Sequence, residues 1–176
     1  RAAEKARDVA AELLDVYARR EMAEGFAFPR PDADFERFCD EFPFELTVDQ
    51  RNAIDATVED LTRGRSADRL ICGDVGFGKT EVAMRAAYIA SQAGKQVAVL
   101  VPTTLLAQQH YETFRDRFSQ WPQQIEFVSR MRQEGDVTRL KDQLSGGAID
   151  IIIGTHRLLT ADFEFKNLGL IIIDEE

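Results

Sequence analysis

The sequence predicts an α/β fold in which an open parallel sheet carries helices on both faces and is preceded by N-terminal helices. From residue 68 onward, short apolar segments alternate with segments of helical periodicity. The apolar segments lack the polar–apolar alternation of half-exposed strands, and strands buried on both faces are typical of parallel sheets covered by helices. Ligands bind at the carboxyl ends of the strands in such sheets, so the residues that follow each strand are the candidates for function.

Five strands and four helices are expected in this part of the chain. The strand candidates are Arg69–Cys72, Gln96–Val101, Gln124–Val128, Ile149–Ile153 and Leu168–Ile173. The helix candidates are Lys79–Gln92, Thr104–Ser119, Asp136–Leu144 and the short His156–Leu159. Phe114, Phe118 and Trp121 recur at helical spacing, and we assign them to the core.

Three segments are predicted along the chain. Residues 1–25 are interpreted as an amphipathic linker helix packed on a neighbouring domain, with a helix that binds a partner protein as the alternative. Residues 26–66 are expected to be helical, and Thr47 and Gln50 stand at capping-box spacing before the longer helix there. Residues 67–176 make up the α/β domain.

Composition limits the class of protein. The 176 residues carry a net charge of −9, with 44% hydrophobic and 30% charged residues, which fits a folded globular chain. The acidic balance counts against a basic DNA-binding stripe, although helix N-termini and hydroxyl groups also bind phosphate backbones. No apolar run is long enough to span a bilayer, so no membrane partner is expected. Cys39 and Cys72 are interpreted as buried thiols of a cytoplasmic protein.

The pattern G-x-x-x-x-G-K-[ST] stands directly after a strand candidate and directly before a helix candidate. Its residues are Gly73, Asp74, Val75, Gly76, Phe77, Gly78, Lys79 and Thr80. The glycines allow backbone N–H groups to approach phosphate oxygens, and the following helix adds the positive end of its dipole. Lys79 would place a cation on the β- and γ-phosphates, and Thr80 would offer a hydroxyl ligand to Mg²⁺. This phosphate loop therefore predicts a site for ATP and Mg²⁺.

The second half of the same site is predicted where the last strand candidate ends. Leu168–Ile173 is followed directly by Asp174, Glu175 and Glu176. Because parallel strands end at one edge of a sheet, these carboxylates should lie near the phosphate loop. Asp174 can support Mg²⁺, and Glu175 can take a proton from an attacking water. Glu175 and Lys79 are thus the candidate catalytic residues.

With these motifs in place, the chain resembles the superfamily 2 helicases. The phosphate loop resembles their motif I, and residues 174–176 resemble the start of the DExx box. Residues 101–110 resemble motif Ia, and residues 153–156 resemble a later DNA-contacting motif. Residues 42–44 together with Gln50 resemble the adenine-reading Q motif. The resemblance implies a RecA-like P-loop domain that is truncated here after motif II.

Within that superfamily, the motifs resemble those of the bacterial transcription-repair coupling factor (Mfd) family and those of the branch-migration helicases of the RecG kind. Phe77 in the phosphate loop and Glu176 after the last strand resemble the former. That resemblance implies an ATP-dependent double-stranded DNA translocase. Such a motor displaces stalled RNA polymerase and recruits nucleotide excision repair proteins through other domains of the full-length protein. A RecG-like branched-DNA helicase and a nucleotide-binding module without turnover remain the alternatives.

The resemblance also assigns residues. It implies that Phe44 and Gln50 contact adenine. It implies that DNA lies along Pro102, Thr103, Thr104, Gly154, Thr155 and His156. Plainer roles stay open at several of these positions, because Gln50 is also the third residue of a capping box and because Thr104 and Thr155 could cap helices.

Overall fold

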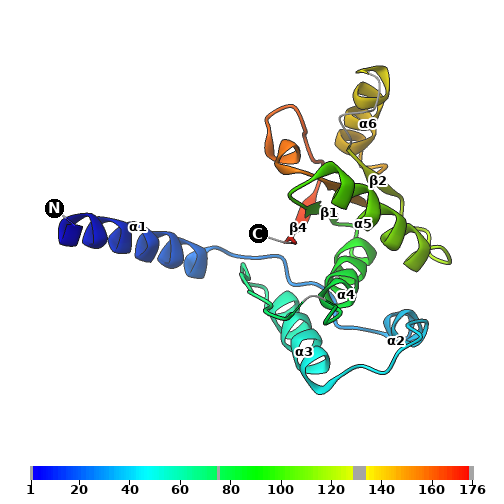
Figure 1. Cartoon of the computed structure of the whole chain (residues 1–176), viewed down its shortest axis with the longest axis horizontal. Helices are drawn as coiled ribbons and strands as arrows, with labels where there is room; N and C mark the ends of the chain where they lie inside the picture. The colour runs from blue at the N-terminus through cyan, green and yellow to red at the C-terminus, as the bar shows by residue number, and fades with distance from the viewer. Residues whose placement is uncertain (1, 75, 129–133, 175–176) are drawn as a thin grey trace.

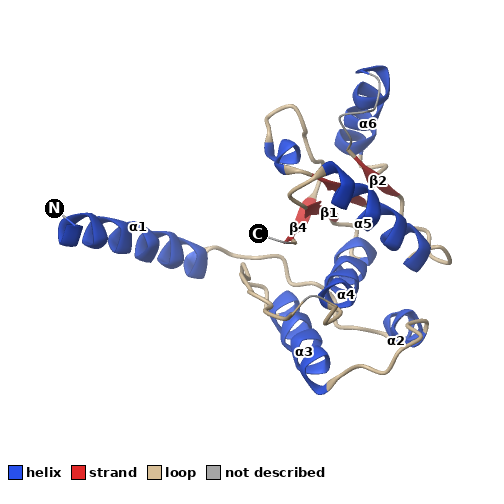
Figure 2. Ribbon diagram, in the orientation of Figure 1, coloured by secondary structure: helices blue, strands red, loops and turns tan. Residues whose placement is uncertain are grey.

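The computed structural model describes residues 2–74, 76–128 and 134–174. Within these residues lies a parallel sheet of four strands in the order β2-β3-β1-β4. The strands are β1 (Gln96–Leu100), β2 (Ile125–Phe127), β3 (Ile151–Gly154) and β4 (Leu168–Ile173). The sheet lies at the centre of the α/β part, with helices around it (Figure 2).

The register of the sheet brings three strand ends together. Leu100, the last residue of β1, pairs with Gly154 of β3 on one side and with Ile173 of β4 on the other. The ladder continues past β1, because the Val101 N–H donates to the Gly154 carbonyl at 2.9 Å. The residues that follow β1, β3 and β4 therefore share one edge of the sheet, as predicted.

Helices cover both faces of the sheet, as predicted from its apolar strands. The helices α4 (Lys79–Gln92) and α5 (Thr104–Arg117) pack on one face, against alternate residues such as Val97 and Val99. The other face packs Ala98 and its neighbours beneath α6 (Glu134–Gly146) and the short 3-10 helix η1 (His156–Leu159). The side chains of β1 and β3 are buried on both faces, which explains why these two strands are apolar without alternation. In β4, by contrast, Leu168, Ile171 and Ile173 are exposed.

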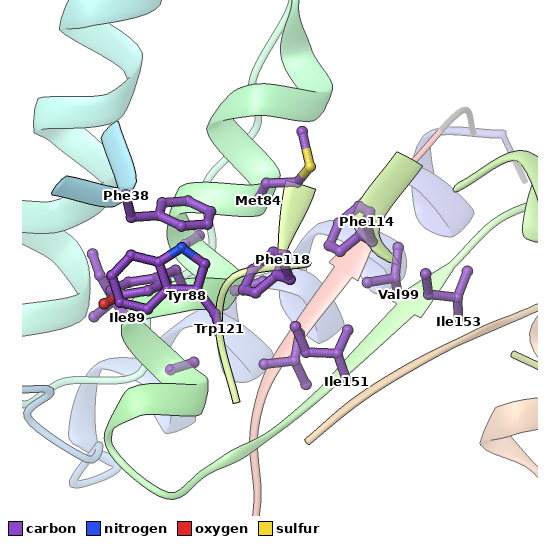
Figure 3. Packing of buried hydrophobic residues seen from close by; sticks show 14 of the residues in the cluster. Phe38, Met84, Tyr88, Ile89, Val99, Phe114, Phe118, Trp121, Ile151 and Ile153 are labelled. Atoms are coloured by element: carbon purple, nitrogen blue, oxygen red, sulfur yellow. The ribbon is translucent and has the colours of Figure 1, made fainter. Parts of the chain in front are cut away.

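An aromatic cluster joins the N-terminal part of the chain to the sheet. The helix α2 (Ala33–Asp40) inserts Phe38, which stacks on Tyr88 of α4 with ring centroids 4.3 Å apart. Trp121 meets Tyr88 edge-on at 4.9 Å, and Phe118 completes the cluster (Figure 3). The assignment of Phe118 and Trp121 to the core is confirmed. Because these rings are fully or almost fully buried, α2 is a fixed part of the domain.

The two other N-terminal helices differ in how they pack. The helix α3 (Val48–Thr62) lies against α4 and starts with the predicted capping box. In that box the Gln50 N–H donates to Thr47 Oγ1 at 3.2 Å, and the Thr47 N–H donates to Gln50 Oε1 at 2.8 Å. The helix α1 (Ala2–Met22) projects away from the rest of the chain (Figure 1), with its apolar residues from Val9 to Tyr17 exposed. No helix in the described ranges combines the length and the hydrophobicity that a membrane span needs.

One predicted strand is wrong. The segment Arg69–Cys72 has no regular secondary structure and belongs to no sheet in the described residues, and Leu70 is 86% exposed. Arg69 instead forms an ion pair with Asp60 on α3. Strand propensity reflects packing and ladder partners rather than the backbone alone, and this segment has neither here. For the same reason Cys72 is exposed rather than buried, while Cys39 is partly buried as a free thiol.

Candidate nucleotide-binding site

The phosphate loop takes a backbone shape that requires glycine at two positions. Gly76 and Gly78 have φ values of +85° and +75°, in the left-handed region that side chains disfavour. Gly78 is also the N-cap residue of α4, so the loop leads directly into the positive end of that helix. Val75 lies outside the described residues. Backbone sites for anions commonly use residues in such left-handed or turn conformations.

The side chain of Lys79 lies across the loop that precedes it. Its ammonium donates to the carbonyl oxygens of Gly73 and Asp74, the latter at 3.0 Å. The Phe77 N–H donates to the same Asp74 carbonyl at 3.1 Å, which closes the turn. Thr80, the next residue of α4, is partly buried. The cation and the hydroxyl predicted to act on phosphates therefore stand side by side at the start of one helix.

Gln50 reaches the phosphate loop from a different helix. Its Nε2 donates to the Phe77 carbonyl at 2.6 Å, although the two residues are 27 positions apart. Its Oε1 accepts from the capping box, so the capping role and a role at the loop hold together. Phe44 stands near this helix start, is 71% exposed and packs edge-on against Phe42. The structure thus brings Gln50 to the loop and leaves the Phe44 ring open to solvent.

Asp174 follows β4 at the edge of the sheet where β1, β3 and β4 end. Its N–H donates to the Leu100 carbonyl at 2.9 Å, which extends the ladder by one residue. Its Oδ2 lies 2.6 Å from Nε2 of His110 on α5. Glu175, the predicted general base, and Glu176 lie outside the described residues. No local sequence pattern reveals this contact of His110 with a carboxylate 64 positions away.

A buried charge cluster, which the sequence did not reveal, lies under the first turn of α4. Glu81 is 2% exposed and accepts from Arg85 Nε at 2.8 Å. Arg117 of α5 donates to both Glu81 oxygens, at 3.2 and 3.3 Å, and to the Phe38 carbonyl. The Arg117 guanidinium also lies 3.8 Å from the centre of the Phe38 ring. The cluster ties α2 and α5 to the turn of α4 that follows Lys79.

The candidate DNA-contacting residues lie at the same edge of the sheet. Pro102 and Thr103 are exposed, and Thr103 rather than Thr104 is the N-cap of α5, since its Oγ1 accepts from the Leu106 N–H at 3.2 Å. The cap predicted at Thr104 is therefore displaced by one residue, and Thr104 begins the helix.

The second candidate segment follows β3. Gly154 ends that strand, and Thr155 is the N-cap residue of η1, but its hydroxyl makes no capping hydrogen bond. His156 is exposed. Because Leu100 and Gly154 are paired in register, the segments after β1 and β3 emerge beside each other. The starts of α5 and η1 therefore lie beside each other at this edge of the sheet.

The donors predicted for Mg²⁺ fit that ion chemically. Thr80 offers a hydroxyl and Asp174 a carboxylate, both hard oxygen ligands of the kind that Mg²⁺ prefers. The described residues contain no group of three or more His, Cys, Asp or Glu side chains that could hold a metal by themselves.

Comparison with known proteins identifies the family. A family model described as DEAD/DEAH box helicase matches residues 47–176. The chain belongs to this family. Over its whole length, this helicase-family chain is 60% identical to the transcription-repair-coupling factor of Escherichia coli strain K12 and 57% identical to that of Haemophilus influenzae. It spans 15% of the length of each of these two relatives.

Two solved structures are similar in fold to this helicase-family chain. The structure of RecG bound to a three-way DNA junction matches 92% of this chain with a TM-score of 0.86 and 36% identity, and the match covers 22% of the RecG chain. The UvsW helicase of bacteriophage T4 matches 84% of this chain and 51% of its own, with a TM-score of 0.55 and 16% identity, which shows the fold alone. The predicted RecA-like fold and the resemblance to helicases and transcription-repair coupling factors are confirmed.

Proposed function

We propose that this chain is the ATP-binding half of a motor that hydrolyses ATP to translocate along double-stranded DNA. The whole protein would displace stalled RNA polymerase and couple transcription to nucleotide excision repair. The observation that carries the proposal is the identity of 60% over the whole chain to a transcription-repair-coupling factor. The identity to the RecG structure is lower, at 36% over 92% of the chain.

The geometry supports ATP as the substrate. The phosphate loop combines three features that suit a phosphate group. These are the positive end of α4, the left-handed glycines Gly76 and Gly78, and the Lys79 ammonium. In this proposal Lys79 exchanges its contacts with the Gly73 and Asp74 carbonyls for phosphate oxygens. Gln50 and Phe44 are proposed to recognise the adenine, and the contact of Gln50 with Phe77 would link that recognition to the loop.

The acidic strand end is proposed to complete the hydrolytic site. Bound Mg²⁺ would neutralise the charge that develops on the phosphates. Thr80 and Asp174 would hold that ion, and Glu175 would take a proton from the attacking water. Asp174 is suited to its role because its backbone is fixed by the ladder to Leu100. A preorganised carboxylate needs little rearrangement during the reaction.

The segments that follow β1 and β3 at the edge of the sheet are proposed to bind the DNA backbone. Pro102, Thr103 and Thr104 precede or begin α5, and Gly154, Thr155 and His156 lead into η1. Neutral helix starts and hydroxyl groups contact phosphates without a basic stripe, which suits a chain of net charge −9. Residues 1–25 would act as the linker helix, residues 26–66 would carry the adenine contacts, and residues 67–176 would form the motor domain.

The test measures ATP hydrolysis by the whole protein with and without duplex DNA. Lys79→Ala should lower turnover at least about a hundredfold, because removal of a group that stabilises transition-state charge costs about 3–4 kcal/mol. Lys141→Ala on α6, a partly buried lysine whose contacts lie with Asp162 and Phe163, is the matched control. A hydrolysis rate that ignores both DNA and Lys79→Ala would refute the proposal.

Two further outcomes distinguish the alternatives. Displacement of stalled RNA polymerase by the wild-type protein, lost in Lys79→Ala, supports the coupling function. Unwinding of branched DNA without polymerase displacement would support the RecG-like alternative. We expect residues 1–176 alone to bind nucleotide weakly and to show little turnover. Turnover by this fragment near that of the whole protein would contradict the view that it is half of a motor.

A further inference from the structure

His110 contacts the acidic strand end of the proposed site from α5. It lies on α5, two turns from the Thr103 cap, and its side chain is 12% exposed. Its Nε2 lies 2.6 Å from Oδ2 of Asp174, whose side chain is 20% exposed. Its Nδ1 lies 3.0 Å from the Leu106 carbonyl one turn earlier in the same helix. Each ring nitrogen therefore faces an oxygen atom.

The hydrogen-bonding rules fix the orientation of this ring. A carbonyl oxygen only accepts, so Nδ1 must donate to Leu106. Nε2 lies 2.6 Å from Oδ2, so the ring and the carboxylate share a short hydrogen bond. Rotation of the ring would break both contacts in a partly buried site. His110 thus holds the Asp174 carboxylate from the side of α5.

The contact continues to the start of α5. The Leu106 carbonyl accepts from His110, and the Leu106 N–H donates to Thr103 Oγ1 at 3.2 Å. Three consecutive hydrogen bonds therefore run from the helix cap to the Asp174 carboxylate. On the other side of that residue, its N–H is fixed to Leu100 of β1. Strand β1 thus holds the backbone of Asp174, whereas His110 on α5 holds its side chain.

We propose that His110 is a positioning residue for Asp174, which orients the carboxylate toward Mg²⁺ bound with nucleotide. This inference rests on the proposed function, because it assumes that Asp174 supports the ion. Partners that orient a ligand of a metal matter for affinity, and their removal commonly costs about 10–100-fold. Mg²⁺ is a weakly held ion with few protein ligands, so an effect near the lower end of that range is expected.

The test compares three substitutions in the whole protein. His110→Leu keeps the bulk and removes both ring nitrogens. His110→Asn places an amide nitrogen near the position of Nδ1 but too far from Asp174. His110→Gln places an amide nitrogen near the position of Nε2 and so restores a donor to the carboxylate. Binding of a fluorescent ADP analogue is titrated with Mg²⁺ and, separately, measured in EDTA, together with the thermal unfolding midpoint.

We expect His110→Leu and His110→Asn to need about tenfold more Mg²⁺ for half of the gain in nucleotide affinity. Their affinity in EDTA should stay within about twofold of wild type, and His110→Gln should recover to within about threefold of the wild-type Mg²⁺ requirement. An unchanged Mg²⁺ midpoint in both variants would overturn the inference. So would an equal loss of affinity with and without Mg²⁺, since that loss would indicate a purely structural role.

The Lys79→Ala variant distinguishes a failure of the role of His110 from a failure of the nucleotide site itself. Loss of ADP-analogue binding in Lys79→Ala, combined with an unchanged Mg²⁺ midpoint in His110→Leu, would refute the role of His110 alone. Undiminished binding in Lys79→Ala would refute the nucleotide site itself, and the role of His110 would fall with it.

Discussion

Replacement of Glu81 by Gln should destabilise the domain more than any exposed charge substitution. Glu81 is 2% exposed and receives hydrogen bonds from Arg85 at 2.8 Å and from Arg117 at 3.2 and 3.3 Å. The side chains of Arg85 and Arg117 are 8% and 10% exposed. Glutamine keeps the size and one acceptor but removes the negative charge. Two guanidinium groups would then remain in a buried site with too little anionic compensation.

The magnitude follows from the burial of all three groups. Removal of one partner from a buried ion pair costs about 3–5 kcal/mol. Arg117 keeps a second carboxylate, since its Nη1 donates to Glu41 at 3.3 Å, so the lower end of the range applies. A cost of about 3 kcal/mol, with a urea dependence of about 2 kcal/mol per molar, lowers the unfolding midpoint by about 1.5 M.

The assay is urea unfolding followed by circular dichroism, and the structure offers a matched control. Glu59 on α3 and Arg63, the C-cap residue of that helix, repeat the same residue types at the same i,i+4 spacing, 2.6 Å apart, but their side chains are 64% and 54% exposed. Exposed pairs of this kind contribute about 0.3–0.5 kcal/mol, so Glu59→Gln should shift the midpoint by about 0.2 M. Equal shifts in Glu81→Gln and Glu59→Gln would show that burial does not decide the cost, and the reasoning would be wrong.

Two further predictions concern the phosphate loop and its neighbour. Gly78→Ala and Gly94→Ala both force alanine into left-handed backbone, at about 1–2 kcal/mol each, but only at Gly78 would the new Cβ meet Gln50 Nε2, at 2.4 Å. Nucleotide affinity should therefore fall at least about fivefold in Gly78→Ala, because the hydrogen bond from Gln50 to Phe77, worth about 1 kcal/mol, is lost. Affinity should stay near wild type in Gly94→Ala. Calorimetry measures both affinities, and equal values would contradict the prediction. Exposed Cys72 should react with a thiol reagent at pH 8 much faster than Cys39. Burial raises the pKa of the Cys39 thiol, so less of the reactive thiolate forms there. ATP should slow the reaction of Cys72 alone, because Cys72 directly precedes the phosphate loop. Peptide mass spectrometry resolves the two rates, and equal rates would refute the assignment.

Local patterns in the sequence determined several elements with their ends. The helix Lys79–Gln92 and the strand Leu168–Ile173 have the predicted bounds, because a glycine loop and an acidic pair delimit them. The capping box at Thr47 and Gln50 also formed as predicted. These features depend on residues within a few positions of each other, where side-chain chemistry and backbone geometry are directly linked. The phosphate loop was predictable for the same reason, because all of its motif residues are contiguous in the sequence.

The tertiary structure decided which distant residues meet. Arg69–Cys72 has the composition of a strand, yet only the arrangement of neighbours determines whether a ladder forms, and here none does within the described residues. The contact of Gln50 with the loop and the burial of Glu81 between two arginines likewise join separate helices. His110 is the clearest example of what the sequence does not predict, because its partner Asp174 lies 64 residues away. Local sequence specifies the elements and the chemistry they carry, whereas long-range packing specifies the partners, because each contact depends on the positions of all the elements around it.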